Sequence, residues 1–233
     1  QELSLSIIVP VFNSERFIEK CLKSLFEQDI PEEDYEIIVI NDGSVDQSWE
    51  VLLRLRNEFK NLILINQENK GVSTARNRGI LSAKGRYILF IDSDDYVVTK
   101  SLGRLIEKAD RDSLDVLFLS FSVYDSKGIF YGQNDYSHLE GKIVDGLKAY
   151  QITRGKKEKD PDRSVGIIYK KAFIQGHCLL FLNDVPYLED GHFVGKVLCL
   201  SDCCAFSKDP FYVHIINPGS ASNSNLYNSI KAR

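Results

Sequence analysis

Continuous apolar segments alternate with segments of helical period along the first ninety-odd residues. The apolar segments lie at residues 4–11, 36–40, 62–65 and 87–91 and are typical of buried strands. Between the first two, apolar residues recur at spacings of three and four: Ile18, Cys21, Leu22, Leu25 and Phe26. This alternation predicts an α/β fold whose sheet is mostly parallel, with helices on both faces.

Small polar residues mark where three of these helices are expected to begin. Asn13-Ser14 offers a cap for the first helix, and Asp46 offers one for a helix that runs through Phe59. Ser73 is expected to cap a helix that continues to about residue 83.

The second half of the chain has a less regular pattern. It predicts a helix at about 102–110, a strand at 116–124 and a turn at 125–128 that returns the chain as a hairpin. Residues 154–163 mix both charge signs without an apolar stripe and predict a solvated loop. Residues 165–169 are apolar again, and a short helix is expected after Tyr187, with Glu189 and Asp190 in its first turn. From Asn217 onward the chain is expected to be loop.

Polar residues follow three of the predicted strands at the end where each strand stops. They are Asn13 and Glu15, then Asp42, then Asp92 with Asp94. The carboxyl ends of parallel strands share one edge of the sheet, so these side chains predict one nucleotide-sized site there. Asp92 and Asp94 point to the same side of an extended chain, and two carboxylates suit Mg²⁺ or Mn²⁺.

Composition excludes several classes of protein. The hydrophobic content of 43% and charged content of 27% are ordinary for a globular domain, and the net charge of -4 argues against a nucleic-acid binder. No apolar run has the length of a membrane-spanning helix and no signal peptide is apparent, so a cytoplasmic location is expected. The five cysteines have no zinc-ligand spacing and read as reduced thiols.

Five short motifs follow one another along the chain. They are residues 8–13 (IVPVFN), 39–46 (VINDGSVD), 69–77 (NKGVSTARN), 92–95 (DSDD) and 189–190 (ED). In these motifs and their order the chain resembles the family 2 glycosyltransferases with the GT-A fold, from residue 4 to about residue 200. The resemblance implies a single GT-A domain, with a nucleotide-sugar-binding half at about 1–100, a smaller mixed acceptor-binding half at about 101–210 and a tail at 211–233.

The resemblance also implies an activity. The chain would transfer a sugar, with inversion, from a nucleotide-diphosphate donor such as a UDP-sugar to a hydroxyl of a glycan or lipid-linked acceptor in cell-surface polysaccharide synthesis. The cofactor would be Mn²⁺ or Mg²⁺, with Asp94 as the metal ligand and Asp95 as a helper. Asp190 would be the catalytic base, with Glu189 as another helper.

The donor site follows from the same motifs. Asp42 would accept hydrogen bonds from the base, Asp92 would meet the ribose, and Arg76 would sit near the base or phosphate. The remaining positions expected around the nucleotide sugar are Pro10, Val11, Phe12, Glu15, Gly71 and Ser93. Without the resemblance, Asp190 reads as a plain helix cap and Asp42 as a turn residue.

One segment departs from the family pattern. Many relatives carry Tyr and Arg before an Asn-Pro-Gly-Ser turn, where this chain has His214 and Ile215. The cation that would assist the leaving diphosphate is therefore missing or replaced by His214. The tail is expected to be truncated, and a missing C-terminal segment could supply a peripheral contact with the membrane.

Two alternatives remain open. A domain that binds nucleotide sugars without turnover is consistent with the altered segment around His214. A sugar nucleotidyltransferase is a weaker alternative, because that class needs a glycine-rich basic loop after the first strand. Residues 10–13 contain neither glycine nor a basic residue.

Overall fold

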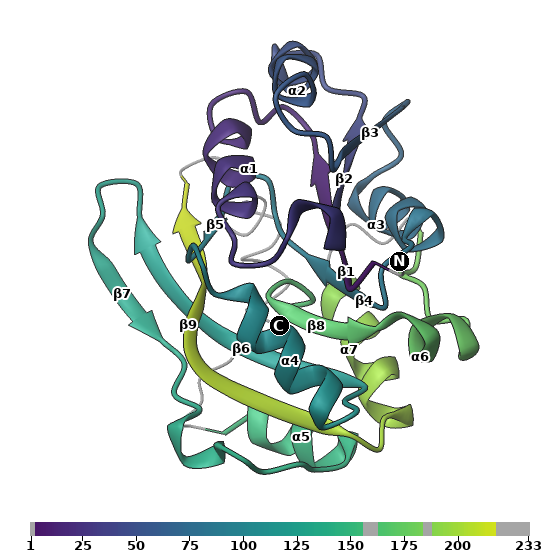
Figure 1. Ribbon diagram of the computed structural model, residues 1–233, viewed down its shortest axis with the longest axis vertical. Helices are drawn as coiled ribbons and strands as arrows, with labels where there is room; N and C mark the ends of the chain where they lie inside the picture. Colours follow the sequence, from purple (N-terminus) through teal and green to yellow (C-terminus); the bar gives the residue numbers. More distant parts are fainter. Residues whose placement is uncertain (1–2, 156–162, 184–187, 218–233) are drawn as a thin grey trace.

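The computed structural model describes residues 3–155, 163–183 and 188–217 (Figure 1). Its strands are β1 (Leu5–Val11), β2 (Tyr35–Asp42), β3 (Leu62–Gln67), β4 (Tyr87–Phe90), β5 (Tyr96–Val97), β6 (Val116–Asp125), β7 (Phe130–Gln133), β8 (Ile167–Lys170) and β9 (Cys204–Ile216). Its α-helices are α1 (Ile18–Phe26), α2 (Ser48–Arg56), α3 (Val72–Ser82), α4 (Leu102–Arg111), α5 (Gly146–Thr153), α6 (Lys171–Gly176) and α7 (Glu189–Leu200). Two 3₁₀ turns, Glu32–Asp34 and Ser137–Leu139, complete the described elements.

One sheet runs through the whole fold, in the order β3-β2-β1-β4-β8-β6-β9-β5, with β7 paired to β6. The first four strands in that order are parallel, as the alternating pattern predicts. β8 then runs antiparallel to both β4 and β6, and β9 runs parallel to β6. The sheet of the second half therefore contains both parallel and antiparallel pairs. It joins the parallel half of the sheet where β8 pairs with β4.

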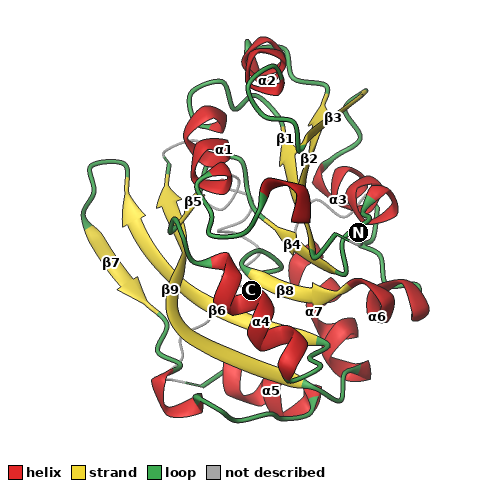
Figure 2. Cartoon of the chain, viewed as in Figure 1, coloured by secondary structure: helices red, strands yellow, loops and turns green. Residues whose placement is uncertain are grey.

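Helices form layers on both faces of the fully buried strands. β1, β2 and β4 are buried along their whole length, because helices cover the two sides of the sheet. In the second half, α4 lies on one face of β6, β8 and β9, and α5 and α7 lie behind them (Figure 2). The β6–β7 hairpin extends away from this body, as its turn residues predict (Figure 1). No helix among the described residues is long and apolar enough to cross a membrane.

Two of the three predicted helix caps are wrong. Ser14 and Asn13 precede α1 by several residues, and their side chains instead bond Ser93 and the backbone N–H of Val45. Ser73 lies inside α3, where its hydroxyl is buried and has no partner among the described residues. Asp46 does accept from the N–H of Ser48 at the start of α2, although this helix ends at Arg56 rather than Phe59.

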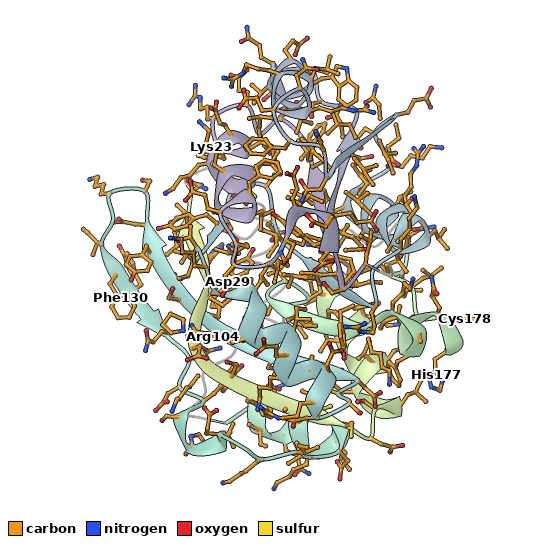
Figure 3. All side chains as sticks on the ribbon, in the orientation of Figure 1. Lys23, Asp29, Arg104, Phe130, His177 and Cys178 are labelled. Carbon is orange, nitrogen blue, oxygen red and sulfur yellow. The ribbon has the colours of Figure 1, made fainter. Side chains whose placement is uncertain are left out.

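Helix ends are instead satisfied by neighbouring segments. Asp29, which follows α1, accepts from the N–H of Gly103 in the first turn of α4 at 2.8 Å, and Figure 3 shows Asp29 beside that helix. Glu15 accepts from the N–H of Gln47, immediately before α2, at 2.9 Å. A cap that comes from another segment leaves no local signal in the helix it serves.

The sequence pattern also missed β5, α5, α6 and β9 and misjudged one residue. α5 lies where the pattern weakens, and the long strand β9 lies where no strand was predicted. Arg163, assigned to a solvated loop, is buried because its guanidinium bonds the carbonyls of Leu119, Val165 and Gly166. The loop predicted from Asn217 onward lies outside the described residues, apart from Asn217 itself.

Candidate active site

An open cavity of about 390 Å³ lies at the carboxyl ends of β1, β2 and β4. The parallel register sets Val11 level with Asn41 and Ile8 level with Phe90, so the residues after these strands converge at one edge. The cavity is lined by Pro10, Val11, Phe12, Asp42, Asn69, Gly71, Val72, Ala75, Asp92, Ser93 and Asp94. Its volume is within the range of small-molecule sites, which begins at about 300 Å³.

Eight residues that the sequence nominated for the nucleotide sugar or its metal line this cavity: Pro10, Val11, Phe12, Asp42, Gly71, Asp92, Ser93 and Asp94. Asn69, Val72 and Ala75 also line it and were not singled out, although they belong to the same loop and helix as Gly71. Phe12 is 50% exposed and lines the cavity, so its aromatic side chain is accessible to a ligand there. Glu15 is not among the lining residues and is directed to the start of α2.

Asp42 fastens the loop that borders the cavity. Its Oδ1 accepts from Gln67 Nε2 at 2.7 Å and from the N–H of Lys70 at 2.9 Å. Its Oδ2 accepts from the N–H of Gly71 at 2.8 Å. A carboxylate offers about four acceptor positions, so one position of Oδ2 has no donor among the described residues.

Arg76 joins three carboxylates that come from two distant parts of the chain. It donates to Asp190 Oδ1 at 2.8 Å, to Asp92 Oδ1 at 3.0 Å and to Glu189 Oε1 at 3.5 Å, and its side chain is only 4% exposed. Burial lowers the pKa of Arg76, but the charges of Asp190, Asp92 and Glu189 raise it above its ordinary value. The guanidinium therefore stays charged and ties α7 to the acidic loop after β4.

Burial lowers the pKa of Arg76 but raises the pKa of two of the carboxylates that Arg76 contacts. It raises the pKa of Asp92, although Arg76 lowers it in part. It also raises the pKa of Glu189, and the charge of neighbouring Asp190 adds to this effect. Arg76 is thus the cation that makes ionised carboxylates tolerable at this position.

The acidic loop is held from the other side by β9. Asp95 accepts from Tyr212 Oη at 2.6 Å and from the N–H of Ile215 at 2.8 Å, and it contacts His214 Nδ1 at 3.1 Å. Burial lowers the pKa of His214, but the hydrogen bond with Asp95 and its charge raise it overall. His214, at which the sequence departs from the family pattern, therefore contacts Asp95.

Asp94 lines the cavity, and its Oδ2 accepts from Asn217 Nδ2 at 3.3 Å. Burial raises the pKa of the Asp94 carboxyl, and the charge of Asp95 raises it further. No group of three His, Cys, Asp or Glu side chains suited to a metal occurs in the described part of the chain. Burial and the neighbouring Asp95 therefore both disfavour the ionised form of Asp94, and a cation would offset this effect.

Asp190 lies beside the cavity and has a partner that the sequence did not reveal. Ser164, which is fully buried, donates its hydroxyl to Asp190 Oδ1 at 2.7 Å. The two residues are 26 positions apart, and Ser164 follows a segment without an apolar pattern. No local signal could have paired them.

The comparisons with known proteins agree with this geometry. The family model of glycosyl transferase family 2 matches residues 6–180. The uncharacterized glycosyltransferase EpsJ of Bacillus subtilis (strain 168) is 33% identical over 220 residues, which are 93% of this chain and 62% of EpsJ. The poly(ribitol-phosphate) beta-glucosyltransferase of Bacillus spizizenii is 27% identical over 216 residues, or 92% of this chain and 32% of that protein.

Solved structures give the same result. The crystal structure of Staphylococcus aureus TarS 1–349 in complex with UDP-GlcNAc matches with a TM-score of 0.80 at 26% identity, over 95% of this chain and 61% of that one. The mannosyltransferase PcManGT of Pyrobaculum calidifontis, in complex with GDP-Man and Mn²⁺, has a TM-score of 0.69 at 17% identity and supports the fold alone.

The fold and the cavity at its strand ends are those of a GT-A domain. The chain belongs to glycosyl transferase family 2. It spans between about a third and three fifths of the length of these curated relatives (32% and 62%).

Proposed function

We propose that this chain is an inverting glycosyltransferase that moves a sugar from a nucleotide-diphosphate donor, most readily a UDP-sugar, to a hydroxyl of an acceptor. The observation that carries the proposal is that Asp92 belongs both to the cavity lining and to the group of carboxylates that Arg76 contacts. The cavity offers the Phe12 ring and the Asp42 carboxylate for a nucleoside. Arg76 joins Asp92, which lines the cavity, to the carboxylate of Asp190. The family membership of the chain supports the same assignment.

In this proposal the nucleoside lies between Phe12 and Asp42. The half-exposed Phe12 ring offers an apolar face on which a base can stack. The remaining acceptor position on Asp42 Oδ2 suits the imide N–H of uracil, which is a donor. Asp92 would meet the ribose, and Gly71 and Ser93 would line the path of the diphosphate.

The residues at the cavity rim fit a divalent cation. Mg²⁺ and Mn²⁺ bound with a diphosphate need only one or two protein carboxylates, the rest of their ligands being phosphate oxygens and water. Asp94, whose pKa is raised by burial and by Asp95, would gain from such a cation. Asn217 lies within reach of the same carboxylate. When bound, the metal would neutralise charge on the leaving diphosphate.

The transfer step assigns the proton to Asp190. The acceptor hydroxyl oxygen forms a bond to the anomeric carbon while its proton passes to the Asp190 carboxylate. The bond from that carbon to the diphosphate breaks, and its electron pair leaves with the nucleoside diphosphate. Attack from the face opposite the leaving group inverts the configuration.

The acceptor is proposed by analogy with relatives. Two of them are named for transfer to poly(ribitol phosphate), one a glucosyltransferase and one the N-acetylglucosaminyltransferase TarS. We therefore propose a cell-surface glycan or polyol-phosphate polymer as acceptor, bound by the half of the chain after residue 100. A cytoplasmic location, peripheral membrane contact and assistance by Glu189, Asp95 or His214 remain predictions.

A ligand screen tests the donor site. UDP, GDP, CDP and dTDP are each added with Mn²⁺ or with EDTA, and Tm is measured for wild type, Asp94→Ala and the surface control Asp209→Ala. A ligand at about 100 times its Kd stabilises by roughly 2.7 kcal/mol. This is about 5 to 10 °C in Tm for a domain of this size. We expect that shift with UDP and Mn²⁺ in wild type and Asp209→Ala only.

Hydrolysis of UDP-GlcNAc and UDP-glucose then tests turnover, because water can replace an unidentified acceptor. Release of UDP by wild type, lost in Asp190→Asn, supports the transferase. Binding of UDP without release of sugar from any donor would favour the alternative of a non-catalytic nucleotide-sugar-binding domain. Absence of any nucleotide-dependent shift would contradict the proposal.

A further inference from the structure

The contacts of Asp190 are concentrated on one of its two oxygens. Oδ1 accepts from Arg76 Nη1 at 2.8 Å and from Ser164 Oγ at 2.7 Å. Among the described residues, no donor bonds Oδ2. The Asp190 side chain is 21% exposed and is therefore only partly buried. The two oxygens of this carboxylate are therefore not equivalent.

Ser164 is itself rigidly placed. It is fully buried, and its carbonyl accepts from Tyr169 Oη at 3.0 Å. The preceding Arg163 bonds the carbonyls of Gly166 and Leu119, both at 2.9 Å. Gly166 has a φ of +61°, and a Cβ there would come within 2.8 Å of Arg163 Nη1. The backbone around Ser164 is thus held by contacts within residues 163–169 and by the bond of Arg163 to β6.

We infer that Ser164 is a positioning residue that, together with Arg76, holds Asp190 by Oδ1 and leaves Oδ2 to take the proton of the acceptor hydroxyl. The two donors come from different elements, the segment before β8 and helix α3, and so fix the carboxylate against rotation about the Cβ–Cγ bond. The inference rests on the proposed function, in which Asp190 is the base. Nothing in the family match assigns a role to Ser164.

Ser164 is a cleaner probe of this arrangement than Arg76. The Arg76 guanidinium also bonds Asp92 and Glu189, so its loss disturbs the donor side of the site. The Ser164 hydroxyl bonds Asp190 and no other side chain among the described residues. Removing it changes the orientation of the base while the cavity lining stays intact.

The chain contains a comparable serine near the amino end of β1, whereas the cavity lies at the carboxyl ends of the strands. Ser6, also fully buried, donates to Glu36 Oε1 at 2.6 Å. Ser6→Ala removes a buried serine–carboxylate hydrogen bond at a place remote from the cavity, and with it the acceptor of the Gly85 N–H at 2.8 Å. We expect it to lower stability without changing turnover.

The experiment compares Ser164→Ala, Ser6→Ala and wild type in hydrolysis of UDP-GlcNAc and UDP-glucose with Mn²⁺. A hydrogen bond to a charged group corresponds to about a 10- to 100-fold change, which we expect as a loss in kcat for Ser164→Ala. The Kd of UDP should change by less than about twofold, because Ser164 does not touch the donor cavity. An unchanged kcat, or a parallel loss in kcat and UDP affinity, would overturn the inference.

A double-mutant cycle separates positioning from a general structural effect. In the Asp190→Asn background, Ser164→Ala should cause no further loss of the residual rate, because both changes act through one base. An equal loss in both backgrounds counts against positioning. If Ser164→Ala does not fold, Ser164→Cys fills the same space with a weaker donor and should give a smaller loss of the same kind.

Crystal structures of the two variants test the inference without a measurement of turnover. The Asp190 carboxylate should rotate or adopt more than one orientation in Ser164→Ala and keep one orientation in Ser6→Ala. If wild type hydrolyses neither sugar nucleotide, that result counts against the proposed function alone. An Asp190 carboxylate that stays in its wild-type orientation in Ser164→Ala would then still overturn the inference.

Discussion

Tyr212 donates its phenolic hydrogen to Asp95 Oδ2 across 2.6 Å, which joins strand β9 to the acidic loop after β4. Tyr212 is fully buried, and Asp95 is buried as well. Burial raises the pKa of the Tyr212 phenol, and the charge of Asp95 raises it further, so the hydroxyl keeps its proton. The contact links residues that are 117 positions apart and holds the cavity rim in place.

Tyr212→Phe is expected to destabilise the protein. It leaves the buried Asp95 carboxylate without one of its donors, which costs about 1 to 3 kcal/mol. Chemical denaturation measures the loss, with Tyr131→Phe as control because the Tyr131 side chain is 62% exposed. A loss no larger than that of Tyr131→Phe would show that the hydrogen bond contributes nothing.

Replacing Arg76 by Met is expected to make stability depend strongly on pH. Three carboxylates then lose their cation, at a cost near the lower end of the range for broken buried pairs, about 3 kcal/mol at pH 7. The lower end applies because Asp92 is 35% exposed.

The sign of this dependence follows from linkage. Burial raises the pKa values of Asp92 and Glu189, and Arg76 lowers them. Without Arg76 both rise further above their unfolded values, so the folded state binds more protons than the unfolded state. Stability of Arg76→Met should therefore fall as pH rises from about 4 to 7. Denaturation curves across this range, compared with wild type, check it, and parallel profiles would refute it.

Asp42→Asn should weaken nucleotide binding by displacing the loop at 69–71. The amide puts an NH₂ group where the carboxylate accepts from Gln67, Lys70 or Gly71. The loss of one such contact, about 1.4 kcal/mol, raises the Kd of UDP roughly tenfold. Titration calorimetry measures it against the exposed control Glu68→Gln. Equal affinities in the two variants would exclude a role for Asp42.

Gly79→Ala and Gly195→Ala form a matched pair of changes within helices. At Gly79 a Cβ would lie 2.4 Å from Ile8 Cγ2 on β1, and overpacking of this kind costs about 1 to 3 kcal/mol. At Gly195 no atom outside the helix lies within 4 Å, and alanine should stabilise by roughly 0.5 to 1 kcal/mol. Changes of the same sign in the two Tm values would contradict the close approach of α3 to β1.

The sequence by itself determined the parallel half of the fold and most of the cavity lining. Strands buried on both faces are continuous apolar runs, and parallel strands bring their carboxyl ends together. Those two facts are sufficient to place Asp42, Asp92 and Asp94 on one edge of the sheet. They also predicted Asn13 and Glu15 in the same site, and neither of these residues lines the cavity. The remaining candidates, Asp190 above all, depended on the family resemblance, because an acid at the start of a helix is common.

Only the tertiary structure decided which groups pair across the chain. Arg76 meets Asp190, Ser164 meets the same oxygen, and Tyr212 meets Asp95 through separations of 114, 26 and 117 residues. The long strand β9 was missed because Ser207, Lys208 and Asp209 interrupt its apolar character. Two helix caps were misplaced because the side chains of Asn13 and Ser14 bond other segments and Ser73 lies inside α3. Periodicity reports only which face of an element is buried, whereas these contacts depend on how distant elements pack, and packing leaves no local pattern.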